Sequence, residues 1–209
     1  EMNKDFCNDY IDLRDPSKKY LITGVVPAVF LVNLDELNGR EVPKTWDDIL
    51  SPEFEDSVAV PMGDLDLFNA LVVNLYKEYG MDGITRLARS YKSENPAVSI
   101  IPYFFTQMIQ GNNQVAVWPE DGAVISPIFM IAKKDKKEKT QPIIDFFMSE
   151  SVGKVFSANG KFPSTNKLVD NGLSPDQKFK WVGWDFIEKT DIGALLRDLE
   201  AKFNEDILK

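Results

Sequence analysis

The sequence predicts an α/β protein with two lobes that share strands. Short runs rich in β-branched residues alternate along the chain with stretches whose apolar residues recur at helical spacing. An acidic elbow at residues 118–123, which contains Pro119 and Gly122, separates two of the strand-like runs. The elbow is typical of a chain crossing between lobes, although a tight solvated turn within one sheet is the alternative. Crossing points in open α/β folds often bind ligands.

The composition limits the classes of partner. The chain has 209 residues and is 44% hydrophobic, which is enough for one large domain or two small lobes. Its 33 acidic and 24 basic residues give a formal charge of −9. An extended nucleic-acid surface needs a basic stripe, so this class of partner is excluded. The acidic balance fits a cationic or metal-bearing small ligand better.

The histidine and cysteine counts limit which catalytic and metal-binding sites the chain can form. The sequence has no histidine, which removes catalytic triads that use it and every zinc site with a histidine ligand. Cys7 is the single cysteine, so we expect an inert thiol and no intrachain disulfide. No run reaches the roughly 18 apolar residues of a membrane span, and no secretory leader opens the chain. Because the sequence begins with Glu1, we expect a processed or truncated product.

The first strand and the first helices are predicted from continuous and periodic apolar patterns. Residues 1–19 are polar and predict an irregular entry segment. Residues 20–32 are continuously apolar, which favours a strand buried on both faces of a parallel or mixed sheet. Thr45 is a plausible cap for a short helix that carries Asp47 and Asp48 in its first turn.

A strand, a turn and a helix follow, as in a β-α unit. Residues 58–61 predict a buried strand, and residues 65–79 carry an apolar helical stripe that Gly80 closes. The helix N-terminus could receive an anion or a carboxylate-bearing ligand, but Asp64 is more simply a helix cap. No glycine-rich phosphate motif of Rossmann or P-loop spacing supports nucleotide binding.

The second half of the chain continues the alternation of predicted strands and helices. A strand at 98–101 leads through Pro102 into three consecutive aromatic residues, which cannot all face one core, so we expect at least one to point into a cleft. Strands at 114–118 and 124–132 flank the elbow, and the lysine-rich run at 133–139 predicts a solvated loop. Helices are expected from about 140, from about 151 and over 191–208. Residues 167–185 are expected to be irregular, with Trp181 and Trp184 fixing the tail to the body.

Four segments resemble a known family. They are residues 27–33 (PAVFLVN), 43–54 (PKTWDDILSPEF), 119–123 (PEDGA) and 146–153 (FFMSESVG). In this order they look like the crossover strands and helices of extracellular solute-binding proteins of ABC importers, which have the two-lobed, periplasmic-binding-protein-like type II fold. The resemblance covers about residues 20–166. The family's opening β-α-β-α portion has no counterpart, which implies that the N-terminal part of the first lobe is absent.

The resemblance implies an organisation and a function. Residues 1–33 and 118–209 would form a partial first lobe and residues 34–117 the second lobe, with Asn33 and Gly122 at the hinge. Such a protein binds without catalysis or cofactor, and closes on a small solute that it delivers to a membrane permease. It would act outside the cytoplasm, in the periplasm or as a cell-surface lipoprotein. Exposed apolar surface on the partial lobe would favour self-association.

By position, seven residues are candidates for contact with the solute. Carboxylates beside aromatic rings suit a polyamine or another organic cation. Carboxylate and phenolate oxygens suit ferric iron, but the pair of adjacent tyrosines usual in iron-binding relatives is replaced by Tyr103-Phe104. The ligand therefore stays open. The candidates are Asp64, Asp66, Tyr103, Phe104, Trp118, Glu120 and Asp121.

Two other functions remain as alternatives. Glu120 with Asp121, or Asp64 with Asp66, could be the carboxylate pair of a hydrolase acting on a sugar. Neighbours in a strand point to opposite faces, so Glu120 and Asp121 form a poor pair unless the elbow twists them together. The second alternative is a protein-interaction module that uses the aromatic residues near Trp181.

Overall fold

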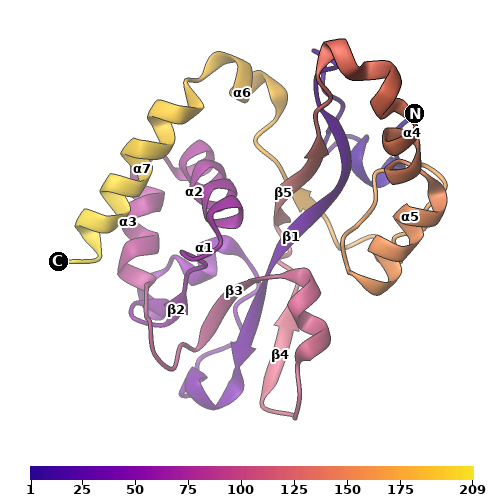
Figure 1. The fold of residues 1–209 in the computed structure, drawn as a ribbon. Helices are drawn as coiled ribbons and strands as arrows, with labels where there is room; N and C mark the ends of the chain where they lie inside the picture. Colours follow the sequence, from indigo (N-terminus) through magenta and orange to yellow (C-terminus); the bar gives the residue numbers. More distant parts are fainter.

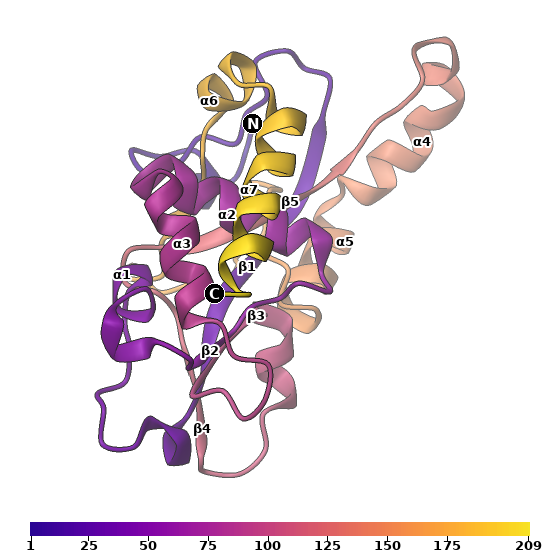
Figure 2. The same cartoon turned by 90° about the vertical axis from the view of Figure 1, so that its left-hand side faces the viewer.

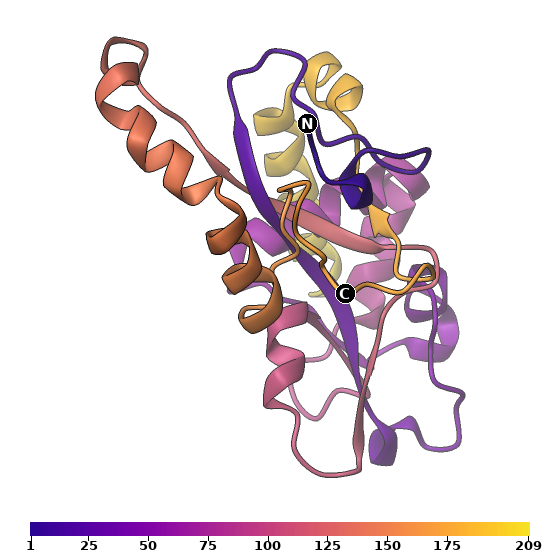
Figure 3. The same cartoon turned by 90° about the vertical axis from the view of Figure 1, so that its right-hand side faces the viewer.

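The structure is a mixed α/β fold built on one long strand (Figure 1). The computed structural model describes residues 1–209, apart from the side chain of Lys137. Its sheet has the strand order β2-β3-β1-β5-β6, and β4 also pairs with β1. The predicted α/β class is confirmed, and the strand β1, Leu21–Asn33, runs through the whole sheet (Figure 3).

The strand β1 changes partner in its middle. Up to Pro27 it pairs antiparallel with β5, Ala123–Met130, and from Ala28 it pairs antiparallel with β3, Val98–Pro102. Its last residues also pair with β4, Gln114–Val117. Four consecutive residues around this change are buried, so both faces of β1 are covered, as the continuous apolar run predicts.

The larger hydrophobic core lies beside the second half of β1. Three helices pack on it: α2 (Leu65–Tyr79), α3 (Met81–Ser90) and α7 (Ile192–Asp206). The predicted Gly80 stop is confirmed, because Gly80 has a φ of 66° and ends α2. The remaining elements here are α1 (Trp46–Ile49) and β2 (Val58–Ala59), which is parallel to β3.

The short helix α1 shows how local sequence fixes an element. The side chain of Thr45 accepts the Asp48 N–H, and the Asp48 carboxylate accepts the N–H of Thr45, so the predicted cap is a complete capping box. The ring of Trp46 is fully buried and packs edge-on against Phe30, with 4.9 Å between ring centroids.

A smaller core lies beside the first half of β1. It includes Phe6, Ile11 and Leu13, although residues 1–19 read as a polar entry segment. The sequence pattern missed them because three isolated apolar residues show no helix or strand period. The strand β6, Phe179–Lys180, lies parallel to β5 inside the stretch expected to be irregular, and α6, Trp184–Lys189, follows it.

The chain leaves β5 as an arm. The helix α4, Lys137–Phe147, stands away from the rest of the molecule at the end of β5 (Figures 2 and 3). It is followed by α5, Glu150–Lys154, and by a π-helical turn, Val155–Asn159. The two helices expected from about 140 and 151 are therefore present.

Candidate ligand-binding cleft

A cleft of about 380 Å³ lies between the N-terminal end of α2 and the strand β5. A volume of this size suits a small solute. One wall comes from the elements of the larger core and the other from strands of the smaller core. The first wall is made of Asp64, Asp66, Leu67 and Phe104, and the second of Val26, Ser126, Pro127, Ile128 and Phe129.

Two carboxylates reach the cleft because α2 begins there. Oδ1 of Asp64 accepts the N–H of Leu67 at 3.2 Å, so the capping role predicted for Asp64 is confirmed. Asp66 follows in the first turn, and both acidic residues are exposed. Negative charge is favourable at this end of a helix because the helix dipole is positive there. The cleft therefore carries two fixed anionic groups on one wall.

The three consecutive aromatic residues point in different directions. Phe104 lines the cleft, and its ring lies 5.1 Å from that of Phe162, which belongs to a loop beside the smaller core. Phe105 is 43% exposed, whereas Tyr103 packs edge-on against Trp118 with 5.2 Å between centroids. The prediction that at least one of the three points into a cleft is confirmed for Phe104.

Trp118 lies beside the smaller core. Its ring is 5.6 Å from that of Phe179, and its Nε1–H donates to the carbonyl of Lys178 at 2.7 Å. Neither Trp118 nor its neighbour Tyr103 lines the cleft with Asp64. Trp118 therefore joins the elbow to the loop before β6, and Tyr103 packs on Trp118.

The acidic elbow holds α1 in place. The carboxylate oxygens of Asp121 each lie 3.2 Å from the Trp46 backbone nitrogen, and the indole N–H of Trp46 donates to the carbonyl of Gly122 at 2.8 Å. Glu120 is exposed, and its backbone N–H donates to the carbonyl of Lys44. Burial raises the pKa of Asp121, and Lys180, 3.6 Å from its carboxylate, opposes that shift.

The elbow and the cleft lie at opposite ends of α2. Lys180 pairs with both Asp121 and Glu78, and Glu78 is in the last turn of α2. Asp64 and Asp66 are at the first turn, and a helix of 15 residues is about 22 Å long. The structure therefore brings Asp64 and Asp66 together with Phe104, and leaves Tyr103, Trp118, Glu120 and Asp121 outside this cleft.

The two residues expected at the hinge have different surroundings. Asn33 pairs with Gln114 at the far end of β1, and its side chain accepts the N–H of Asp35. Gly122 has a φ of 106° and lies against Phe179, where an added Cβ would come within 3.0 Å of the carbonyl. The strand β1 changes partner between Pro27 and Ala28, and Ala28 lies five positions before Asn33.

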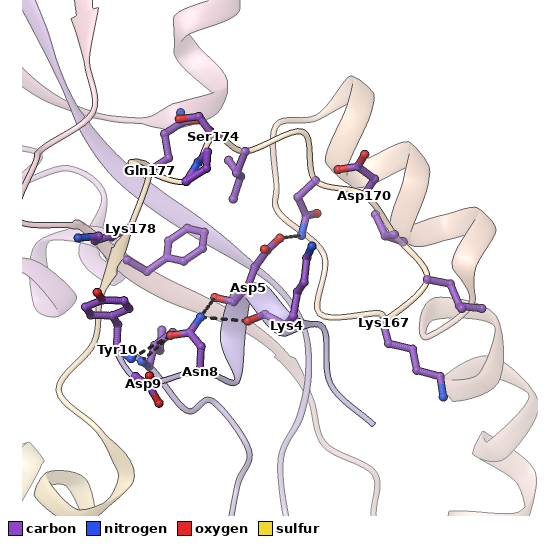
Figure 4. Close-up of a pocket in the computed structure, with 17 residues that line it drawn as sticks. Lys4, Asp5, Asn8, Asp9, Tyr10, Lys167, Asp170, Ser174, Gln177 and Lys178 are labelled. Carbon is purple, nitrogen blue, oxygen red and sulfur yellow. Dashed lines mark hydrogen bonds between the residues drawn. The ribbon is translucent and has the colours of Figure 1, made fainter.

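A larger cavity, of about 660 Å³, lies away from the predicted residues (Figure 4). It is formed by residues 4–11 and 167–179, which flank only the smaller core. Its polar groups largely bind one another: Asn171 donates to Asp5, and Asn8 donates to two backbone carbonyls of its own turn. The cleft at α2 has one wall from each half of the molecule. The larger cavity is lined from one half only.

Metal-binding clusters and membrane-spanning helices are both absent from the part of the chain that the structure describes. No group of three or more acidic, histidine or cysteine side chains is placed to hold a metal ion there. In the same described residues, none of the helices combines the length and the apolar character that a membrane crossing requires.

Solved structures show the same fold at low sequence identity. The periplasmic binding protein P5PA is 18% identical, with a TM-score of 0.63 over 90% of this chain and 69% of that one. AfuA from Actinobacillus pleuropneumoniae, with fructose-6-phosphate bound, is 19% identical, with a TM-score of 0.60 over 91% and 69%. A Bordetella ferric binding protein is 11% identical, with a TM-score of 0.67 over 98% and 77%. These likenesses confirm the type II fold. No curated protein matches the chain.

The family is shown by a match of sequence pattern. The family of bacterial extracellular solute-binding proteins matches residues 1–94 and 88–190, which is most of the chain. Solute-binding proteins of this kind capture a small ligand outside the cytoplasm and act with an ABC permease. The chain belongs to the bacterial extracellular solute-binding proteins.

Proposed function

We propose that the solute binds in the cleft between α2 and β5 and that the molecule closes around it by bending β1 near Pro27 and Ala28. The observation that carries this proposal is that the two walls of the cleft come from different halves of the sheet. A ligand that touches both walls stabilises the closed form more than the open one. The elbow at Gly122 is the second connection that bends.

The proposed lobes follow the two cores, except that Val124 of β5 and Val182 lie in the larger core. The second lobe comprises residues 28–117 together with α7, because Leu199 and Phe203 of α7 lie in the larger core. The first lobe comprises the residues before Pro27, the strands β5 and β6, and the arm that contains α4. The resemblance placed residues 28–33 and α7 in the first lobe. The division proposed from the two cores places both in the second lobe.

The proposed ligand is an organic cation of the polyamine class. Two carboxylates, Asp64 and Asp66, stand on one wall, and the rings of Phe104 and Phe129 line the same cleft. Carboxylates pair with ammonium groups, and aromatic faces attract cations once water is displaced. The solute phosphate of AfuA is an anion, which two uncompensated carboxylates would repel.

Ferric iron is the second candidate, since ferric binding proteins share the fold. Iron favours oxygen donors such as phenolates, and Tyr103 packs against Trp118 away from the cleft lining. The two carboxylates and Ser126 are the acidic and hydroxyl groups on its walls. This donor set favours the organic cation over the metal ion.

The first experiment is ligand-dependent melting with spermidine, putrescine, ferric citrate and fructose-6-phosphate. A ligand at a hundredfold excess over its dissociation constant stabilises the folded protein by about 2.7 kcal/mol. The proposal expects a rise in Tm with a polyamine and none with the sugar phosphate. A rise with ferric citrate alone would assign the cleft to iron.

The second experiment places the ligand within the structure. Asp64→Asn and Asp66→Asn remove charge, and asparagine still caps a helix. We expect each to weaken polyamine binding roughly tenfold, which is about 1.4 kcal/mol. The matched control is Asp82→Asn, because Asp82 is an exposed residue in the first turn of α3. Affinity that falls with Asp121→Asn but not with the two cleft variants would move the site to the elbow.

We propose that the protein binds its solute without converting it into a product. Asp64 caps α2 and Asp121 accepts the backbone N–H of Trp46, so one member of each predicted carboxylate pair already has a structural partner. Mass spectrometry of a polyamine or an oligosaccharide after incubation should return the compound unchanged. Turnover of either would contradict the proposal.

We also propose that the chain associates with a second copy of itself. Its support is the apolar surface of the proposed first lobe outside the cleft, where large side chains of α4 and the π-helical turn are exposed. Sedimentation velocity over a concentration series measures it directly. A single monomeric species at every concentration would contradict it.

A further inference from the structure

The chain passes between the two cores at β1, at the elbow and, for a third time, at residues 179–182. Phe179 is buried in the smaller core and Val182 in the larger one, and Trp181 packs against both. In Figure 1 this segment leads from the side of β5 towards α6. Because Phe179 and Val182 are so close in the chain, any turn of one core relative to the other has to be accommodated between them.

Lys180 ties this third connection to two other elements. Its Nζ pairs with the carboxylate of Glu78, near the end of α2, and lies 3.6 Å from the carboxylate of Asp121 in the elbow. The side chain of Lys180 is only 15% exposed, although a lysine on an open surface keeps its ammonium group in water. The strand β6, the helix α2 and the elbow therefore meet at one ammonium group.

The two carboxylates depend on Lys180 for their charge balance. Burial raises the pKa of Asp121 most, Lys180 lowers it and Glu78 raises it, so the two carboxylates are close enough to repel one another. Among the described side chains, no other cation pairs with either carboxylate. Arg86 of α3 pairs instead with Asp47. Lys180 is thus the group that lets Glu78 and Asp121 lie close together.

The contacts of Lys180 are far from the cleft. Glu78 lies in the last turn of α2, whereas Asp64 and Asp66, which line the cleft, lie at the opposite end of this helix, about 22 Å away. Lys180 lines no part of the cleft. An effect of Lys180 on solute binding must therefore act through the positions of the two halves of the molecule.

We infer that Lys180 is a positioning residue that holds the proposed lobes in the arrangement with an open cleft. This inference rests on the proposed function, because it takes closure by bending of β1 and the elbow as its starting point. Closure turns β6 relative to α2, and an ion pair is effective only within about 4 Å, so the turn separates Lys180 from Glu78. The pair therefore stabilises the open form, and a solute must overcome this stabilisation to close the cleft.

The distance between the lobes tests the inference without any ligand. In a Cys7→Ser background, Met62→Cys and Ile131→Cys carry one spin label each, and pulsed electron spin resonance measures the distance between the labels. Met62 lies two residues before Asp64 on one wall of the cleft. Ile131 lies two residues after Phe129 on the other wall. Closure should therefore shorten this distance.

Two variants remove the ion pair in different ways. Glu78→Gln leaves Lys180 paired with Asp121 alone, and Lys180→Met removes both pairs. We expect each variant to shift part of the population to the shorter distance, and Lys180→Arg to keep the distribution of the unmodified chain. Lys202→Met is the matched control, because Lys202 pairs with Asp206 within α7.

Four results would overturn the inference. The first is an unchanged distance distribution in both Glu78→Gln and Lys180→Met, and the second is a shift to longer distances in either of them. The third is an equal shift in Lys202→Met, which would mean that loss of any ion pair has the same effect. The fourth is a Lys180→Arg chain that behaves like Lys180→Met, because the positive charge would then not be the cause.

Titration calorimetry with spermidine separates this inference from the proposed solute site. Glu78→Gln should bind spermidine about threefold more tightly than the unmodified chain, because a larger fraction of its molecules is ready to close. Unchanged or weaker binding by Glu78→Gln would overturn the inference. Failure of every chain to bind spermidine would contradict the polyamine proposal alone, and the ligand-free distances would still decide the role of Lys180.

Discussion

The two cores of this molecule differ in size and in how completely they are covered. The larger core contains 26 described buried apolar residues, drawn from strands on one side and from α2, α3 and α7 on the other, whereas the smaller core contains seven. Buried apolar area is the main favourable term in folding. The proposed second lobe, which holds the larger core, therefore buries most of the apolar side chains, while the proposed first lobe depends more on its contact with β1.

The strongest test of the larger core is Trp46→Ala. The side chain is fully buried and its indole N–H donates to Gly122, so the variant loses both packing and a hydrogen bond. We expect a loss of about 3–5 kcal/mol in the free energy of unfolding. Chemical denaturation measures it. Trp184→Ala is the control, since Trp184 is only partly buried. An equal loss of stability in Trp184→Ala would show that the effect of Trp46→Ala does not come from its burial in the larger core.

The next test compares the two cores directly. Phe6→Ala removes a fully buried ring from the smaller core, where it stacks on Phe179 with 4.8 Å between centroids. We expect a loss of about 3 kcal/mol in the free energy of unfolding, confined to the proposed first lobe. Hydrogen exchange should therefore speed up in β5 and β6 but not in α2 or α3. Phe203→Ala is the reciprocal variant, and the same exchange pattern in both would mean that the cores unfold as one.

The sequence predicted the larger core better than the smaller one for a physical reason. The stripe of α2, the cap at Thr45 and the continuous run of β1 are local patterns, and each is confirmed. The smaller core joins Phe6 to Phe179, and no local pattern links residues so far apart in the chain. This lobe therefore could be predicted only from the family resemblance.

The candidate site was also predicted only in part, because local patterns do not show which distant residues come together. The first-turn carboxylates of α2 and the run of three aromatic residues were visible in the sequence, and Asp64, Asp66 and Phe104 do line one cleft. Their opposite wall, formed by Ser126 to Phe129, was not predicted, because an apolar strand gives no sign of which side chains face a cleft. Asp121 read as a ligand group, but its oxygens accept the N–H of Trp46 from a helix 75 residues away in sequence.

A smaller effect is expected at Gly122, in the elbow that we propose connects the two lobes. Gly122 has a φ of 106°, and a Cβ there would lie 3.0 Å from the carbonyl of Phe179, so Gly122→Ala combines backbone strain with a close contact. We expect a loss of about 2 kcal/mol by thermal melting. Gly172→Ala is the matched control, because Gly172 also has a positive φ but nothing lies within 4 Å. Equal losses would assign the whole effect to φ.

The smallest expected effect concerns the tie between α7 and α3 and depends on pH. Lys209 donates to the carboxylate of Asp206, as do Thr85 and Lys202, and these bonds hold the pKa of Asp206 well below its usual range. Because the pKa is lower in the folded than in the unfolded chain, the stabilisation is present above the unfolded value near 3.9 and is lost as pH falls towards the folded value. Asp206→Asn should therefore cost about 1 kcal/mol at pH 7 and less below pH 4. Denaturation at pH 7 and pH 3 measures the difference, with Asp185→Asn, whose side chain is 90% exposed, as the control. An equal cost for Asp206→Asn at both pH values would show that Asp206 acts through packing and not through its charge.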